Sequence, residues 1–167
     1  KLFGAVNLPA DEPFIITSNH NSFLDIPAIT LLFPGHYYPL AKKELLKIPI
    51  MGWVIKKTCV IVDRSDAESR SKSLEMLKHH LGQGNSVLIY PEGHMNRSDN
   101  SLLPFRNGAF RLALETKTKI LPVVIKNSAR LMPPDKFSLK PGTIPVYFDQ
   151  PIEITHNDSV ESLKNYT

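Results

Sequence analysis

The chain has one cysteine among its 167 residues, so no intrachain disulfide can form. A protein without disulfides suits a reducing compartment. Cys59 lies in the apolar run TCVIV, which is typical of a buried strand, and no histidine or cation lies beside it on the same strand face. We therefore expect Cys59 to be a small core residue rather than a nucleophile.

Long apolar runs are also missing. None approaches the ~18 residues that a membrane-spanning helix needs, and no signal peptide is evident. We therefore expect that this chain does not cross a bilayer. It begins at Lys1 rather than at methionine, which is typical of a processed or truncated product and is compatible with an anchor in a preceding segment.

The chain has little excess charge and few aromatic residues. Lys and Arg number 20 against 16 Asp and Glu, and aromatic residues make up 8% of the sequence. A nucleic-acid-binding module would show a denser basic stripe with aromatic residues between the cations, so we expect no nucleic acid partner. The net charge of +4 instead favours phosphates, acidic carriers and anionic membranes.

The spacing of a metal site is absent as well. His36, His79, His80 and His156 have no cysteine or acidic partner at the distance along the chain that a zinc site needs. We therefore expect neither a metal ion nor another bound cofactor.

Short apolar runs alternate with helical patterns, and 42% hydrophobic residues suffice for a sizeable core. We expect strands at residues 13–18, 37–41, 59–62, 86–90, 119–125, 143–148 and 151–154. We expect helices at residues 22–33, 66–81 and 105–117, and a proline-rich loop at 131–142. Continuous β-branched runs spaced by helices indicate an α/β fold with a mixed, largely parallel central sheet and helices on both faces, an α/β sandwich. We expect a single domain, residues 1–167.

The segment KKELLKIPIMGWVIKK, residues 42–57, has lysine pairs at both ends of an apolar stretch that includes Met51 and Trp53. One interpretation is an interfacial patch, with apolar side chains in the acyl region of a membrane and lysines at the headgroups. The other is an amphipathic core helix with solvated lysines. We favour the core helix because short apolar helices are usually buried.

The stretch ITSNHNSFLDIPAI, residues 16–29, places His20 five positions before Asp25 at a polar turn between apolar runs. Within one helix the two side chains would point ~140° apart, so they can meet only if His20 lies in the turn before the helix. Asp25 would then fix one ring nitrogen of His20 and leave the other as a base toward a hydroxyl. The alternative is ordinary capping, with Ser22 as cap and Asp25 near the helix dipole.

No G-x-S-x-G motif supplies a serine nucleophile. A base at His20 would therefore activate the substrate's own hydroxyl, without a covalent enzyme intermediate.

Four short motifs follow one another along the chain: NHNSFLD (19–25), VIVDR (60–64), YPEG (90–93) and ILPVVI (120–125). They resemble, in order, the four signature blocks of the glycerolipid acyltransferases of the 1-acylglycerol-3-phosphate acyltransferase type, the first of which is N-H-x4-D. The segment PFRNGAFRLA (104–113) is similar to the family's segment after the third block.

The resemblance implies an O-acyltransferase of phospholipid biosynthesis. It would move a fatty acyl group from acyl-CoA or acyl carrier protein to a hydroxyl of a lysoglycerophospholipid, with 1-acylglycerol-3-phosphate as the expected acceptor. It also implies a peripheral location on the cytoplasmic side of a membrane, and residues 42–57, in their interfacial interpretation, are the candidate contact.

The resemblance also assigns roles to residues. His20 and Asp25 would be the catalytic pair. Arg64 ends the second block and is expected to bind the acceptor's phosphate, which suits a planar guanidinium. Glu92 and Gly93 match the third block, which shapes the acceptor site.

The fourth block implies that Pro122 shapes the pocket, whereas the third block departs from the family pattern. The sequence EGHMNRSDN has His94 where the family has threonine, and Arg97 stands four residues after Gly93 instead of two. We expect either that Arg97 reaches a phosphate or that His94 and Asn96 recognise a different headgroup.

Two other functions stay open, a catalytically silent lipid-binding domain and an acyl thioesterase in which His20 activates water. For acyl transfer, we expect backbone N–H groups of residues 19–22 or near Gly93 to stabilise the oxyanion.

Overall fold

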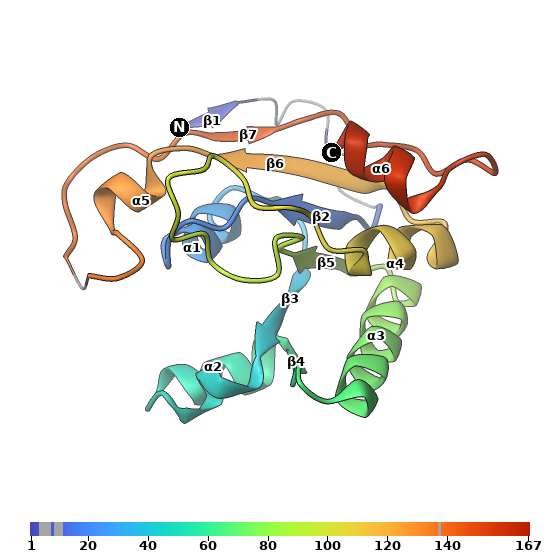
Figure 1. The fold of residues 1–167 in the computed structure, drawn as a ribbon, viewed down its shortest axis with the longest axis horizontal. Coiled ribbons are helices and arrows are strands. Elements are labelled where there is room, and N and C mark those ends of the chain that lie inside the picture. The colour runs from blue at the N-terminus through green and yellow to red at the C-terminus, as the bar shows by residue number, and fades with distance from the viewer. Residues whose placement is uncertain (4–7, 9–11, 137) are drawn as a thin grey trace.

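The computed structural model describes residues 1–3, 8, 12–136 and 138–167 (Figure 1). A seven-stranded sheet with the order β1-β7-β6-β2-β5-β3-β4 forms its centre. The strands are β1 (Leu2–Phe3), β2 (Ile15–Ser18), β3 (Tyr37–Lys42), β4 (Val60–Val62), β5 (Ser86–Ile89), β6 (Ile120–Ile125) and β7 (Val146–Phe148). β6 and β7 pair antiparallel, whereas the other neighbouring strands pair in parallel. The prediction of a mixed, largely parallel sheet is confirmed.

Helices cover both faces of this sheet. The helices of the described residues are α1 (Asp25–Thr30), the 3-10 helix η2 (Lys43–Lys47), α2 (Met51–Thr58), α3 (Ala67–Gly82), α4 (Gly108–Thr116), α5 (Ser128–Leu131) and α6 (Val160–Tyr166). Neighbouring residues of β2 point to opposite faces, so Ile16 joins the core under α1, while Ile15 joins the core under α3, α4 and α6. The predicted sandwich is confirmed.

Some predicted boundaries differ from the structure. The helix expected at 22–33 begins at Asp25, because the chain first turns at Ser22, whose carbonyl accepts from the Asp25 N–H at 3.2 Å. The strand expected at 151–154 contributes only a bridge between Ile152 and Ile120, and Pro151 has no N–H for a ladder.

The predicted helix at 105–117 begins only at Gly108, and the predicted strand at 143–148 only at Val146. Position 137 of the expected loop, and positions 4–7 and 9–11 of the expected domain, lie outside the described residues.

The favoured interpretation of residues 42–57 as a buried core helix is wrong. The segment forms η2 and α2, and Gly52 is the buried residue of α2. Ile50 is 85% exposed and Trp53 is 65% exposed. Gly52 packs so closely on the backbone of Leu46 that a Cβ would overlap it, so α2 packs against η2 and stands away from the main body of the sheet (Figure 1). No helix in the described part of the chain has both the length and the apolarity to span a bilayer.

The core under α4 gives the first prediction. Phe110 is fully buried there and stacks on Phe105, with ring centroids 6.2 Å apart. Because Phe110→Ala leaves a cavity that the packed sheet cannot close, it should lower the free energy of unfolding by about 3–5 kcal/mol in urea denaturation. Leu31→Ala, at an 83% exposed position, is the control and should change it by less than about 0.5 kcal/mol. Equal effects of the two variants would contradict the placement of Phe110.

Candidate active site

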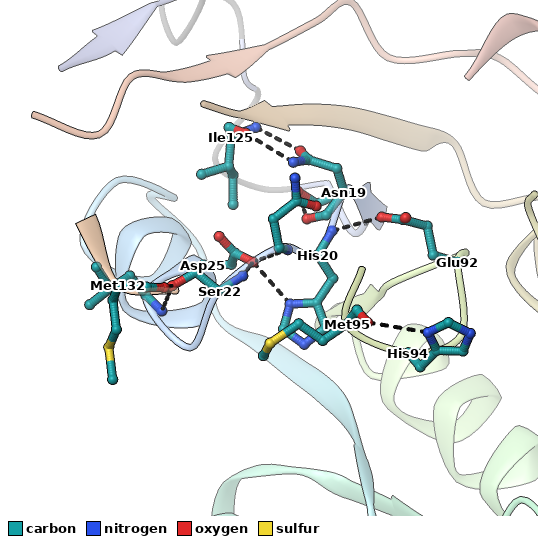
Figure 2. A network of polar contacts seen from close by, with 12 residues as sticks. Asn19, His20, Ser22, Asp25, Glu92, His94, Met95, Ile125 and Met132 are labelled. Carbon is teal, nitrogen blue, oxygen red and sulfur yellow. Dashed lines mark hydrogen bonds and ion pairs between the residues drawn. The ribbon is translucent and has the colours of Figure 1, made fainter. Parts of the chain in front are cut away.

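The site lies beyond the carboxyl ends of β6, β2 and β5, which are neighbouring parallel strands. β2 ends at Ser18, and the next side chain, that of Asn19, is bonded to β6 (Figure 2). The Asn19 Nδ2 donates to the Ile125 carbonyl oxygen at 2.9 Å, and the Ile125 N–H donates to the Asn19 Oδ1 at 2.8 Å. Because both bonds are buried, they hold the turn after β2 firmly against the neighbouring strand.

Asp25 fixes the ring of His20 from the start of α1. Its Oδ2 accepts from the His20 Nδ1 at 3.0 Å and from the N–H groups of Asn21 and Ser22 at 2.8 Å each (Figure 2). Asp25 is fully buried, so three donors on one oxygen hold the carboxylate in a single orientation. The bond to Nδ1 sets the tautomer and leaves Nε2 as the nitrogen that can take a proton from a substrate. The predicted contact is present, and the catalytic roles of the pair stay predictions.

Ser22 is not a side-chain cap of α1. The helix is preceded by Leu24, with no side-chain hydrogen bond at that end. The Ser22 hydroxyl instead donates to the Met132 carbonyl oxygen at 2.7 Å and accepts from the Leu24 N–H at 3.2 Å. The bond to Met132 anchors the turn to the segment after α5, and the bond from Leu24 lies within the turn.

Glu92 supports His20 from the β5 side. Its Oε1 accepts from the His20 N–H at 2.8 Å, and its Oε2 accepts from the Leu103 N–H at 2.9 Å. The residue is only 2% exposed. The carboxylate therefore positions the backbone of His20, and its expected contact with a substrate stays a prediction.

Tyr90 holds the plane of the His20 ring. The two rings stack with centroids 3.9 Å apart and an angle of 15° between their planes. Burial, and secondarily the charge of Asp25, raise the pKa of the Tyr90 hydroxyl well above its ordinary value, so the phenol stays neutral. The sequence interpretation missed this residue because a tyrosine as the last residue of an expected apolar strand indicates only a core position.

His20 lines a cavity of about 380 Å³ whose lining includes both cationic and apolar side chains. The cations along it are Lys42, Arg64 and Arg97, and the apolar part includes Phe23, Ile26 and Leu45. The structure thus brings the predicted residues Arg64, Gly93 and Arg97 to the cavity of His20. Lys42 was missed, and its one signal was a lysine that ends a strand within the run LAKKE.

Arg64 and Gly93 line this cavity, and Arg106, which does not line it, affects both. Burial, and secondarily the charge of Arg106, lower the pKa of Arg64, while Glu44 opposes this. The guanidinium remains protonated at neutral pH nevertheless. Gly93 has φ +83°, and a Cβ there would overlap the side chain of Arg106, so only glycine fits.

The remodelled third block forms a loop that Asn96 organises. Its Oδ1 accepts from the N–H and the hydroxyl of Ser98 at 2.9 and 2.7 Å, and its Nδ2 donates to the Asn100 carbonyl oxygen at 2.8 Å. Both amide atoms are therefore used within the loop, which does not fit the expected headgroup contact of Asn96. His94 is exposed and lines the same cavity as Arg97.

Four of the backbone N–H groups expected to stabilise an oxyanion are already in use. The N–H groups of His20, Asn21 and Ser22 donate to the two carboxylates described above. The N–H of Gly93 donates to the Tyr90 carbonyl oxygen at 3.0 Å. These four donors are therefore unavailable without a rearrangement of the turn.

Other residues singled out in the sequence lie apart from this cavity. Pro122 pairs with Thr17 between β6 and β2 and lines a second cavity of about 460 Å³ beside Asn19. Cys59 is half-buried rather than fully buried, and burial raises the pKa of its thiol, so it stays protonated. Within the described residues, no three histidine, cysteine or acidic side chains come together as a metal site would require.

The fold and the site define an α/β domain in which a carboxylate-held histidine faces a cavity lined by cations. The chain matches the model of the Acyltransferase family over residues 2–126, and it belongs to that family.

Its relatives are consistent with this assignment. A chloroplastic 1-acyl-sn-glycerol-3-phosphate acyltransferase of Brassica napus is 34% identical over 153 residues, which cover 89% of this chain and 44% of that protein. The 1-acyl-sn-glycerol-3-phosphate acyltransferase of Saccharomyces cerevisiae is 34% identical over 158 residues, or 91% of this chain and 51% of that one.

A solved structure resembles the whole fold. The crystal structure of the 1-acyl-sn-glycerophosphate (LPA) acyltransferase PlsC from Thermotoga maritima superposes with a TM-score of 0.82 at 31% identity, over 99% of this chain and 66% of that one. The chain spans about half the length of the curated relatives it matches.

The buried contacts of Glu92 give the second prediction. Glu92→Ala leaves the N–H groups of His20 and Leu103 without acceptors, so the free energy of unfolding should fall by about 2–5 kcal/mol. Urea denaturation measures the change. Glu68→Ala breaks an exposed ion pair with Lys72 and is the matched control, with an expected loss below about 1 kcal/mol. A Glu92→Ala variant as stable as the control would contradict the role of Glu92 in positioning the His20 backbone.

Proposed function

We propose that the chain transfers a fatty acyl group from an acyl thioester to a hydroxyl of a lysoglycerophospholipid, with 1-acylglycerol-3-phosphate as the acceptor. The observation that carries this proposal is the His20–Asp25 pair at a cavity that both cationic and apolar side chains line. Such a lining fits an acceptor with a phosphate at one end and an acyl chain at the other. The names of the relatives support the same acceptor.

In the proposed reaction, the acceptor hydroxyl gives its proton to the Nε2 of His20 while its oxygen attacks the thioester carbonyl carbon. Asp25 stabilises the imidazolium that forms. When the tetrahedral intermediate collapses, the carbon–sulfur bond breaks, the new ester forms and the proton passes from His20 to the departing thiolate. No cofactor is needed, because the thioester already carries an activated acyl group. Acyl-CoA or acyl carrier protein is the co-substrate.

Charge recognition in the proposed reaction comes from side chains. The acceptor's phosphate lies close to its reacting hydroxyl, so it must bind in the cavity that contains His20. Lys42, Arg64 and Arg97 line that cavity, and guanidinium groups suit phosphate. Since the N–H groups of the turn are in use, these cations are also the candidates for stabilising the oxyanion.

The third prediction tests the base. His20→Ala removes the nitrogen that takes the acceptor's proton, so turnover should fall by at least about 10²-fold. Thiol release from acyl-CoA, with and without lysophosphatidic acid, measures it, and circular dichroism checks the fold. His156→Ala, at an exposed position away from the cavity, is the control.

An acceptor screen tests the reaction class. Glycerol-3-phosphate, several lysophospholipids and water are offered with acyl-CoA, and mass spectrometry identifies the lipid products. Acyl transfer predicts one added acyl chain on the lysophospholipid. Free fatty acid with every acceptor would make the chain a thioesterase, and binding without thiol release would make it a silent lipid-binding domain.

We further infer that the chain meets the membrane from its cytoplasmic side through the α2 patch, defined as Ile50, Met51, Trp53 and Val54. All four side chains are exposed, and Lys57 lies over the Trp53 ring at 4.3 Å. Ile50 has φ +63°, which is strained for a β-branched residue and supports a functional reason for its exposure. Lysines on both sides of the patch match anionic headgroups.

The fourth prediction tests this patch. The double substitution Ile50→Ser with Trp53→Ser removes the two most exposed apolar side chains of the α2 patch. Binding to phosphatidylglycerol-containing vesicles should therefore weaken by at least about tenfold. Vesicle sedimentation measures it. Leu139→Ser removes a 70% exposed leucine elsewhere and should leave binding unchanged. Vesicle binding that survives the double substitution would exclude the α2 patch.

A further inference from the structure

A cleft of about 380 Å³, distinct from the two cavities described above, lies between α3, α4 and the ends of β3, β4 and β5. Four arginines line it, Arg64, Arg70, Arg106 and Arg111, and its apolar floor includes Leu74, Leu77 and Ile89. We call it the four-arginine cleft. Gly108, at the N-terminus of α4, also lines it, so the positive end of this helix adds to the same field.

The positive charge of the four-arginine cleft is not neutralised by the surrounding protein. Across the described part of the chain, none of the four guanidinium groups forms an ion pair with a carboxylate. Glu44 acts on Arg64 at longer range, and the Arg70 Nη1 donates to the Arg64 carbonyl oxygen at 2.7 Å. Four like charges around one cleft repel each other, and a bound polyanion would remove that repulsion.

The position of the cleft indicates that its ligand is not the acceptor's phosphate. The cleft shares Leu40 and Arg64 with the cavity of His20, but His20 itself does not line it. The acceptor's phosphate must lie within a few bonds of the reacting hydroxyl, so it belongs in the cavity. A phosphate group at the far end of a long donor molecule belongs instead in a neighbouring cleft. Coenzyme A has this form, because the pantetheine arm separates its phosphates from the thioester.

We propose that the four-arginine cleft binds the nucleotide phosphates of an acyl-CoA donor, while the pantetheine arm passes Arg64 to bring the thioester to His20. The apolar floor of Leu74, Leu77 and Ile89 offers a surface for the adenine ring, and the guanidinium planes can stack on it. This inference rests on the proposed acyl transfer and assigns the donor to one carrier class.

The test uses Arg70→Gln and Arg111→Gln, two exposed positions outside the cavity of His20. With palmitoyl-CoA, each variant should raise the KM for the donor by about three- to tenfold and leave kcat and the KM for lysophosphatidic acid unchanged. With a palmitoyl thioester of N-acetylcysteamine, which lacks the nucleotide, the variants should behave like the unaltered protein. Arg130→Gln in α5 removes the same charge outside the cleft and is the matched control.

A second measurement does not depend on activity. Calorimetric titration with 3′,5′-adenosine diphosphate should show binding that weakens with salt and that falls in both variants but not in Arg130→Gln. If this binding holds while the acceptor screen yields no acylated lipid, the proposed function fails and the anion site stands.

If both variants are active and have normal KM values for palmitoyl-CoA, the proposal that the cleft binds the nucleotide of the donor is wrong, while the proposed function stays intact. An effect of the variants that is confined to palmitoyl-acyl carrier protein would also overturn it, because the cleft would then serve a protein carrier.

Discussion

The hydrogen bonds to one oxygen of Asp25 are the constraint on which the site depends. That oxygen accepts from the His20 ring and from two N–H groups of the preceding turn, so one carboxylate fixes both the imidazole and the backbone that carries it. A fully buried carboxylate without such donors would be strongly destabilising, and the turn would lose its acceptor without the carboxylate. The spacing of five residues follows from this arrangement, because His20 must stand before the helix that Asp25 begins.

The sheet extends this constraint to the whole domain. β2 carries the turn, and the strands on its two sides each hold it: Asn19 bonds to the end of β6, and Glu92, after β5, accepts from the His20 backbone. Parallel strands end at the same edge, so side chains far apart in the sequence converge there. Folding therefore already places the His20 imidazole, and little reorganisation of the site remains when a substrate binds.

The sheet and the His20–Asp25 contact could be predicted because their signals are local: β-branched runs for the buried strands, and a short spacing across a turn for the pair. Other features depend on tertiary contacts. Residues 42–57 are amphipathic whether their apolar side meets a core or a lipid, and the close contact of Gly52 with Leu46, which holds α2 on η2, cannot be read from the sequence. The N–H groups that donate to Glu92 belong to His20 and Leu103, so no window around residue 92 shows that its oxygens are occupied. The four arginines come from separate segments and gather only when α3 and α4 pack on the sheet.

β3 connects the three surfaces on which the proposed chemistry relies. Leu40 lines both the cavity of His20 and the four-arginine cleft, and Lys42, at the end of the strand, lines the cavity. The chain then continues directly through η2, whose Leu45 still lines the cavity, into α2 and its exposed apolar patch. A lipid acceptor arriving from the α2 patch would therefore reach His20 past η2, whereas a nucleotide donor would reach it from the cleft past Leu40 and Arg64. Because the first half of β3 pairs with β5 and the second half with β4, the strand can hold these sites at a fixed separation while the two substrates come and go.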